Sequence, residues 1–125
     1  ADTAELRAYR EAFEEAQEAL DQALRAAERE DRQAFVESFT PADPDISRTE
    51  PERVYENLRQ DLKNGFAHQV SPFESMFAMD VEQAAKRFQK TGMVEGRWRR
   101  VKPDFVSTDI VHLQRHEGRW RIHHW

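Results

Sequence analysis

Residues 110–125 of the sequence read IVHLQRHEGRWRIHHW, with two runs of large side chains on either side of Glu117-Gly118. A glycine in a two-residue connection between alternating runs is typical of a β-hairpin turn. With this turn the cross-strand partners follow: Arg115 with Trp120, Leu113 with Ile122, Val111 with His124, and His112 with His123. We therefore expect two antiparallel strands here.

Strand signals continue upstream of this hairpin. We predict strands over residues 93–101, 105–115 and 119–125, with Lys102-Pro103-Asp104 as a turn. Period-2 alternation sorts the side chains of the last two strands onto two faces. One face collects Phe105, Asp109, Val111, Leu113, Trp120, Ile122 and His124, and the other Val106, Thr108, Ile110, His112, Gln114, Arg121, His123 and Trp125. Both faces are apolar away from the turn, so we expect both to be covered there.

In the first half of the chain, apolar residues recur with the spacing of an α-helix. A one-sided helix is predicted from Leu6 to Ala27, because apolar residues recur at steps of three and four. Asp31 can cap a short second helix that ends before Pro41. Residues 40–45 form a loop with two prolines, and Thr49 has capping-box spacing for a third helix that ends at Gly65. The first stripe is Leu6, Tyr9, Phe13, Ala16, Leu20, Leu24 and Ala27, and the third helix has Val54, Tyr55, Leu58 and Leu62.

Two structures compete for residues 71–91. Ser71-Pro72-Phe73-Glu74 has the residues of a helix start, and steps of four, four, three and four favour a fourth helix, with Phe73, Phe77, Val81, Ala84 and Phe88 on one face. Alternation favours two strands instead, one with Phe73, Ser75, Phe77, Met79 and Val81, and one with Phe88, Gly92, Val94 and Trp98. Local patterns leave both possibilities open.

Composition and charge limit the class of protein. A length of 125 residues fits a single domain over residues 1–125. No apolar run is long enough to span a bilayer, and without cysteine there is no thiolate metal site and no cysteine nucleophile. The start Ala1-Asp2-Thr3, which lacks methionine, favours an exported protein over a cytoplasmic one.

Charge is divided unevenly along the chain. Residues 1–62 hold 8 Lys/Arg and 17 Asp/Glu, residues 63–125 hold 11 and 7, and these add up to the net charge of -5. We therefore expect an acidic helical layer against a basic sheet. The basic run at residues 97–102, which contains Trp98, has the charge and ring of a single-strand nucleic-acid site. The acidic balance of the whole chain favours a solvated strand face instead, so we expect no nucleic-acid partner.

The hairpin residues Leu113–Gln114–Arg115–His116–Glu117–Gly118–Arg119–Trp120–Arg121–Ile122–His123–His124 resemble the final hairpin of the nuclear transport factor 2-like (cystatin-like α+β) superfamily. Residues 23–39 are similar to the end of the first helix, acidic break and short second helix of these domains. The polyketide-cyclase-like and ketosteroid-isomerase-like branch is the nearest in pattern. The resemblance implies an α+β fold, with three N-terminal helices packed on a curved, mainly antiparallel sheet that forms a cone around a pocket. It also implies homodimerisation through the outer sheet face, and strand over residues 71–91, which we adopt.

Candidate site residues follow from this cone. We predict a pocket for a small apolar ligand, lined by Tyr9, Phe13, Tyr55, Trp98 and Trp120. Asp109 lies on the face of Val111 and diagonal to His124, so the two could form an acid–base pair at the pocket mouth. Alternatively, Asp109 caps a turn or pairs with an arginine, and the tyrosines are core residues with their hydroxyls at the surface.

The histidines of the hairpin are candidate metal ligands. His112 and His123, if paired, could hold zinc or copper only when His68 or His116 supplies a third ligand, and no carboxylate is placed to complete the site. We therefore predict no metal and no cofactor. Two classes of function remain open: a ligand-binding or dimerising partner module, and a small isomerase, cyclase or lyase that uses Asp109 and His124 on a hydrophobic substrate.

Overall fold

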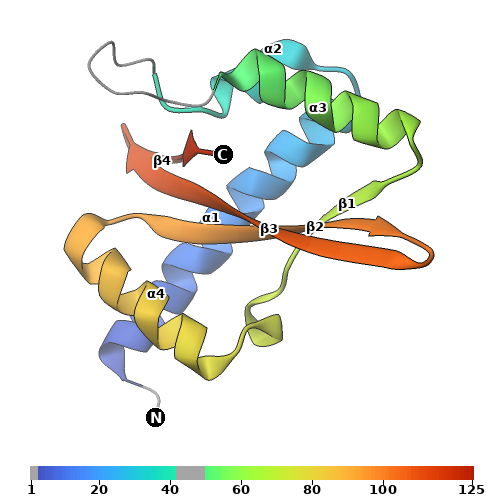
Figure 1. The fold of residues 1–125 in the computed structure, drawn as a ribbon. Helices are drawn as coiled ribbons and strands as arrows, with labels where there is room; N and C mark the ends of the chain where they lie inside the picture. The colour runs from blue at the N-terminus through green and yellow to red at the C-terminus, as the bar shows by residue number, and fades with distance from the viewer. Residues whose placement is uncertain (1–2, 42–49) are drawn as a thin grey trace.

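The computed structural model describes residues 3–41 and 50–125. In this part of the chain, helices pack on a single antiparallel sheet (Figure 1). Along the chain the elements are α1 (Ala4–Glu28), α2 (Arg32–Glu37), α3 (Pro51–Lys63), β1 (Ala67–Val70), the 3-10 turn η1 (Phe73–Ser75), α4 (Ala78–Thr91), β2 (Val94–Lys102), β3 (Phe105–His116) and β4 (Arg119–His124). The predicted α+β class with helices packed on a curved antiparallel sheet is confirmed. No helix in the described part is long and apolar enough to cross a membrane.

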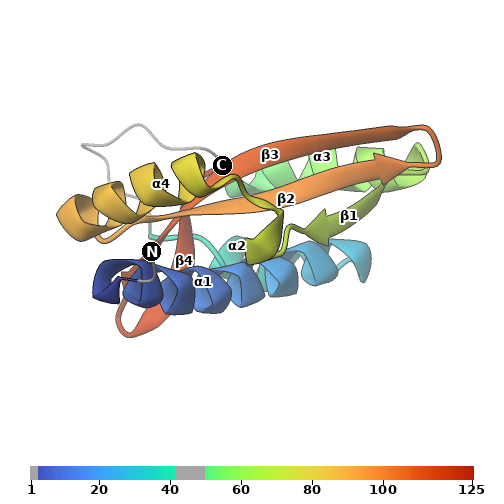
Figure 2. The same ribbon diagram turned by 90° about the horizontal axis from the view of Figure 1, so that it is seen from below.

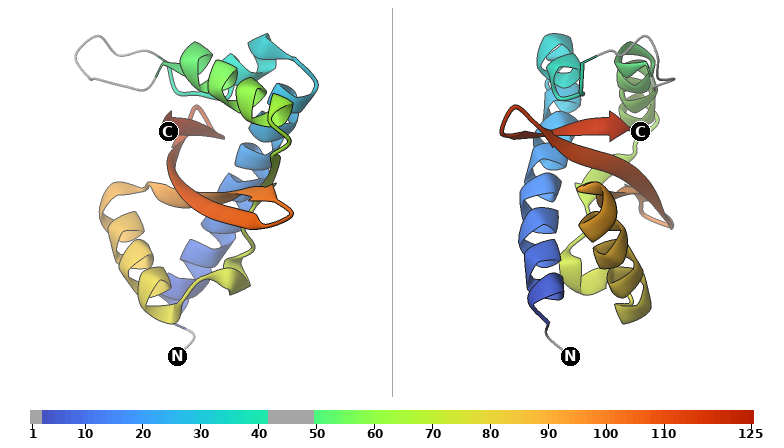
Figure 3. Two further views of the ribbon diagram at one scale, coloured as in Figure 1. Left: turned by 45° about the vertical axis from the view of Figure 1, so that its right-hand side comes forward. Right: turned by 90° about the vertical axis from the view of Figure 1, so that its left-hand side faces the viewer.

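The sheet has the strand order β1-β2-β3-β4, with all neighbours antiparallel. Figure 3 shows how strongly β3 curls as it passes from β2 to β4. The predicted turn is present, since Glu117 and Gly118 take φ of 52° and 79°, as a tight hairpin turn requires. The predicted pairs Leu113–Ile122 and Arg115–Trp120 are confirmed.

The predicted register is wrong beyond Ile122. His112 pairs with His124 rather than His123, so β4 carries one extra residue opposite β3. Such a bulge turns the following side chains to the other face. The side chain of Trp125 therefore lies on the inner face of the sheet, where its ring centroid is 5.4 Å from that of Trp98. The burial of a large indole against other aromatic rings stabilises this bulged arrangement.

The outer edge of β4 is covered by the segment that follows α2. Ile122 donates to the carbonyl of Ser38 and accepts from Thr40 N, both at 2.8 Å, and Phe39 forms a parallel bridge with Ile122. Because these hydrogen bonds satisfy the backbone N–H and C=O of Ile122, β4 cannot pair with another strand at this point. α2 itself starts as predicted, with Asp31 accepting from Ala34 N at 3.1 Å.

The long helix α1 carries the core. Its predicted apolar stripe is buried from Tyr9 to Ala27, with Tyr9, Leu20 and Leu24 fully inaccessible, and is partly buried at Leu6. Ile122 of β4 belongs to the same core. Figure 2 shows α1 running along one side of the strands. The helix comes close to β2 at Gly96, where an added Cβ would lie 3.0 Å from Gln17 Oε1 and 3.4 Å from Leu20 Cδ2, and 2.5 Å from Leu113 Cδ1 of the neighbouring strand β3. Only glycine fits this approach without a shift.

A side-chain amide fixes α1 to β2. β1 ends at Val70, and Gln17 takes the place of the missing strand at Arg97: its Oε1 accepts from Arg97 N at 2.9 Å. Its Nε2 donates to the carbonyls of Arg97 and Ser71, each at 2.8 Å. Gln17 is 6% exposed, so these bonds satisfy backbone groups that have no access to water.

Residues 73–75 and 78–91 are helical, as η1 and α4, so the strand adopted from the resemblance is wrong here. Gly92 closes α4 with φ of 71°. The physical reason is the second half of the predicted helical stripe, because Val81, Ala84 and Phe88 pack into the core, whereas Phe77 before α4 is 80% exposed. Phe88 meets Tyr9 with ring centroids 5.7 Å apart. Strand β1 was not predicted at all.

α3 begins at Pro51, with Glu50 as its N-cap residue and without a side-chain capping bond. The predicted capping residue Thr49 and most of the loop at residues 40–45 lie outside the described residues. In Figure 1, α3 lies above the β2–β3 ribbon and α4 lies below it.

Gln17→Met should destabilise the fold by roughly 2–4 kcal/mol, because Arg97 N–H and the carbonyl of Ser71 would lose buried partners. Urea unfolding followed by circular dichroism measures the change. Gln22→Met makes the same substitution at an exposed position of α1 and should leave stability within about 0.5 kcal/mol. Equal stabilities of the two variants would contradict this role for Gln17.

Candidate functional site

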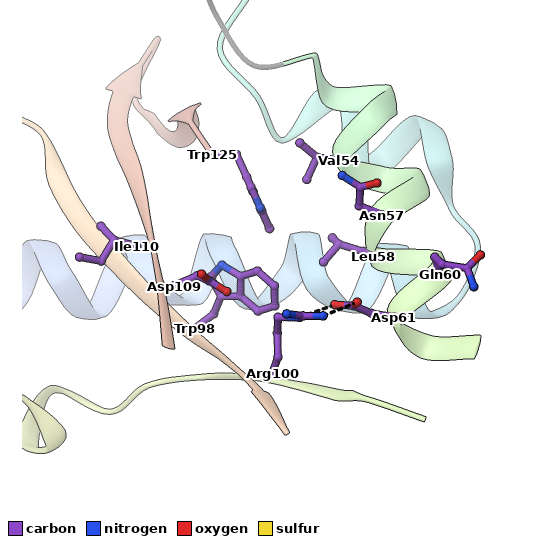
Figure 4. A pocket seen from close by; sticks show the side chains of 10 residues that line it. All are labelled: Val54, Asn57, Leu58, Gln60, Asp61, Trp98, Arg100, Asp109, Ile110 and Trp125. Carbon is purple, nitrogen blue, oxygen red and sulfur yellow. Dashed lines mark hydrogen bonds and ion pairs between the residues drawn. The ribbon is translucent and has the colours of Figure 1, made fainter. Parts of the chain in front are cut away.

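A cleft of about 550 Å³ opens between α3 and the inner face of β2 and β3. α3 packs against α1 and α2, so its remaining face is free to form one wall. Figure 4 shows the side chains that line the cleft. They are Val54, Asn57, Leu58, Gln60 and Asp61 from α3, Trp98 and Arg100 from β2, Asp109 and Ile110 from β3, and Trp125. A volume of this size suits a small molecule.

Asp61, Arg100 and His68 join α3 to the sheet at one end of the cleft. Arg100 donates twice to Asp61, from Nε and Nη2 at 2.7 Å each (Figure 4). Asp61 Oδ2, the oxygen that accepts from Arg100 Nε, also lies 3.1 Å from His68 Nε2. Two-pronged contacts between guanidinium and carboxylate fix orientation as well as distance. The cluster therefore sets where the C-terminal half of α3 lies relative to β2.

The environment of this cluster determines its charge. Burial acts to raise the pKa of Asp61, but hydrogen bonds from Arg100 and His68 outweigh it and hold the pKa below the ordinary 3.8. Burial lowers the pKa of His68 below 6.5, against the opposing effect of Asp61. Near neutral pH the cluster thus holds an ionised carboxylate, a guanidinium and a neutral imidazole.

Two indole rings form the aromatic side of the cleft. Trp98 and Trp125 have ring centroids 5.4 Å apart and an interplanar angle of 49°. Behind them, Trp125 packs on Phe35 and Phe39, and Trp98 meets His68 edge to face. Trp98 Nε1 and His68 Nδ1 are buried without a hydrogen-bond partner among the described residues. Buried polar atoms without partners are uncommon and mark sites under functional or structural strain.

Asp109 faces this cleft, but the predicted acid–base pair with His124 does not form. Asp109 pairs with Trp98 across the strands, whereas His124 pairs with His112 and lies on the opposite face. The bulge in β4 causes the difference, since the uninterrupted register would have put His124 opposite Val111. Asp109 is exposed and has no hydrogen bond or ion pair among the described residues.

The predicted pocket residues separate into three places. Trp98 lines the cleft as expected. Tyr9, Phe13 and Tyr55 do not line it; they are at most 6% exposed and belong to the core. The pKa of Tyr9 is raised to about 12 by burial, so this hydroxyl stays protonated. Trp120 lies in a second cavity, of about 470 Å³, between α1, α4 and the final hairpin, where its Nε1 donates to Glu15 at 3.0 Å.

The sequence did not predict the cluster that Asp61, Arg100 and His68 form at the cleft. Asp61 follows Leu58 at a step of three and so shares its helix face, and Arg100 follows Trp98 at a step of two and shares its strand face. These spacings place both near the cleft, but only the three-dimensional packing brings them together. His68 was considered solely as a metal ligand, and β1, which carries it, was not predicted.

The basic run and the hairpin histidines have other roles. Trp98 is 3% exposed, so its ring is not offered for stacking on a nucleotide base. Among residues 3–41 and 50–125, no group of three or more His, Asp and Glu side chains is arranged to hold a metal ion. His112 meets His124 at 5.9 Å between ring centroids, and His123 lies 3.4 Å from Thr40 Oγ1.

Comparison of the chain with protein-family models, with curated proteins and with solved structures found no match in any of the three.

Asp61→Asn should destabilise the protein at neutral pH by roughly 1–3 kcal/mol, because Arg100 would lose its ionised partner in a partly buried site. The pKa of Asp61 is lowered in the folded state, so the wild-type advantage is complete above pH 3.8 and is lost as the pH falls through the folded pKa. Urea unfolding at neutral and at acidic pH measures both effects.

Glu82→Gln is the matched control for this variant, since Glu82 is exposed on α4. It should change stability by less than about 0.5 kcal/mol. A constant difference between wild type and Asp61→Asn at every pH would contradict the assigned ionisation.

Proposed function

We propose that this chain is a small-ligand-binding module whose binding site is the cleft between α3 and the sheet. The observation that carries the proposal is the cleft itself, which combines two indoles with polar groups held in fixed positions. Ligand sites are usually concave, largely apolar and supplied with a few oriented polar groups.

Binding is favoured over catalysis by the placement of the ionisable groups. A general acid and a general base must both reach the reacting group, and Asp109 and His124 lie on opposite faces of β3 and β4. The remaining carboxylate of the cleft, Asp61, accepts three hydrogen bonds that stabilise its ionised form. The isomerase or cyclase alternative thus loses the pair on which it was based.

Membership of the nuclear transport factor 2-like superfamily also remains a proposal. It is supported by a long first helix that packs into a curled antiparallel sheet and by a cleft on the inner face of that sheet. α4 argues for a distant relationship, because it occupies residues for which the resemblance implied strand.

A neutral apolar fluorescent probe, N-phenyl-1-naphthylamine, tests the binding site. Asn57→Trp should abolish the enhanced fluorescence of the probe, because Asn57 is an exposed residue of α3 that lines the cleft and an indole there would fill it. Arg53→Trp adds the same side chain to α3 outside the cleft and should retain probe binding. Circular dichroism verifies that both variants fold.

The second cavity supplies the decisive comparison. Ala8 is exposed and lines that cavity, so Ala8→Trp fills it and leaves the α3 cleft open. Binding that survives Ala8→Trp and is lost in Asn57→Trp supports the proposal. The opposite pattern, or no probe binding by the wild-type protein, would overturn it.

The homodimer implied by the resemblance stays a prediction. The outer face of β3 exposes Val106 by 59%, and Ile110, which also borders the cleft, by 45%. A twofold contact would use this same patch on both copies. Native mass spectrometry should give twice the 14.8 kDa chain mass, and Val106→Lys should shift the protein toward monomer. Met79→Lys, at an exposed apolar residue of α4, should not. A monomeric wild-type protein would refute the dimer.

A further inference from the structure

We infer that the ligand of the α3 cleft is an organic cation, an amine with an apolar body whose charge pairs with Asp109. The inference rests on the proposed function and specifies the chemistry of the same site. It follows from the charges of the cleft, the aromatic rings beside them and one carboxylate that has no partner among the residues that the structure describes.

The ionisable side chains of the cleft carry a net negative charge. Three residues that line it are ionisable: Asp61, Arg100 and Asp109. Asp61 and Arg100 neutralise each other through two contacts of 2.7 Å, and His68 behind them is neutral near pH 7 because burial lowers its pKa. Asp109 is left with one negative charge, so the cleft as a whole is negative and favours a cation.

Asp109 has no cationic partner in residues 3–41 and 50–125, the part of the chain that the structure describes. Arg100 is the nearest candidate on this face of the sheet, but its pKa is raised first by its hydrogen bond to Asp61 and least by its attraction to Asp109. Both of its contacting nitrogens, however, are directed to Asp61 (Figure 4). Among the described residues, no lysine, arginine or histidine forms an ion pair with Asp109. A ligand ammonium would supply the missing charge and its hydrogen bonds.

Asp109 lies beside the aromatic wall of the cleft. It pairs directly with Trp98 across the strands, and in such pairs the side chains stand about 5 Å apart at Cβ. Trp125 meets Trp98 at an angle of 49° and forms a corner with it, and Figure 4 shows Trp125 projecting toward Asp109 and Trp98. The negative face of an indole attracts a cation; Trp98 is 3% exposed, so the partly exposed Trp125 is the ring that offers this face. An apolar ligand body would contact Val54 and Leu58 across the cleft.

Three ligands of nearly equal shape and different charge test the inference: 1-naphthylmethylamine, 1-naphthalenemethanol and 1-naphthoate. Isothermal titration calorimetry at neutral pH and low salt measures the affinity of each for the wild-type protein and its variants. The amine should bind about tenfold more tightly than the alcohol, and the carboxylate most weakly. High salt should narrow these differences, because the cleft is open to solvent.

Two variants separate a specific contact from the overall acidity of the chain. Asp109→Asn keeps the shape of the side chain and should remove most of the preference for the amine, while binding of the alcohol stays nearly constant. Asp104→Asn removes an exposed carboxylate at the β2–β3 turn, outside the cleft, and should keep the full preference. Asn57→Trp should block all three ligands.

Each alternative result has a distinct meaning. If the alcohol binds as tightly as the amine, or if Asp109→Asn and Asp104→Asn lower the preference equally, the cation is not recognised by Asp109 and the inference fails, while the cleft remains a binding site. If the ligands bind equally well to Asn57→Trp, or none binds the wild-type protein, the proposed function fails with it.

Discussion

The side-chain amide of Gln17 connects the helical and sheet parts of this molecule, because it completes the hydrogen bonding of β2 where β1 has ended. This contact fixes the position of α1 along its axis and its rotation about that axis, since a glutamine side chain reaches a strand edge only when the two backbones are close. Gly96 permits that approach by leaving no Cβ between strand and helix. With α1 anchored, the positions of α2 and α3, which pack on it, follow.

Local chemistry in the sequence was sufficient for most elements and for their ends. The apolar stripe of α1, the Asp31 cap and the Glu117-Gly118 turn each act within a few residues, and all three are present. The same local rules also indicated helix over residues 71–91, and the family resemblance wrongly replaced them with strand. Strand β1 was missed because four residues carry too short a pattern to be recognised.

The site was less predictable, because it depends on contacts between residues far apart in the chain. Alternation placed Asp109 and Trp98 correctly, since both depend only on strand periodicity. The cluster of Asp61, His68 and Arg100 depends on the crossing of α3 over β1 and β2, which no local pattern encodes. Tyr9 and Phe13 were misplaced because an apolar helix stripe looks the same whether it lines a cavity or fills a core.

The aromatic corner of the cleft depends on the bulge in β4. Side chains of a regular strand alternate between faces, and by alternation alone Trp125, three positions after Ile122, would lie on the opposite face from Ile122. The bulge adds one residue to this stretch and so returns the indole to the face of Ile122. A related chain of the same length that closed this stretch without the bulge would retain the sheet and present His124 to the cleft, whereas a chain one residue shorter here would keep the indole on the inner face by simple alternation. The length of the final strand and the presence of the bulge together therefore separate chains of this scaffold that have the aromatic corner from those that lack it.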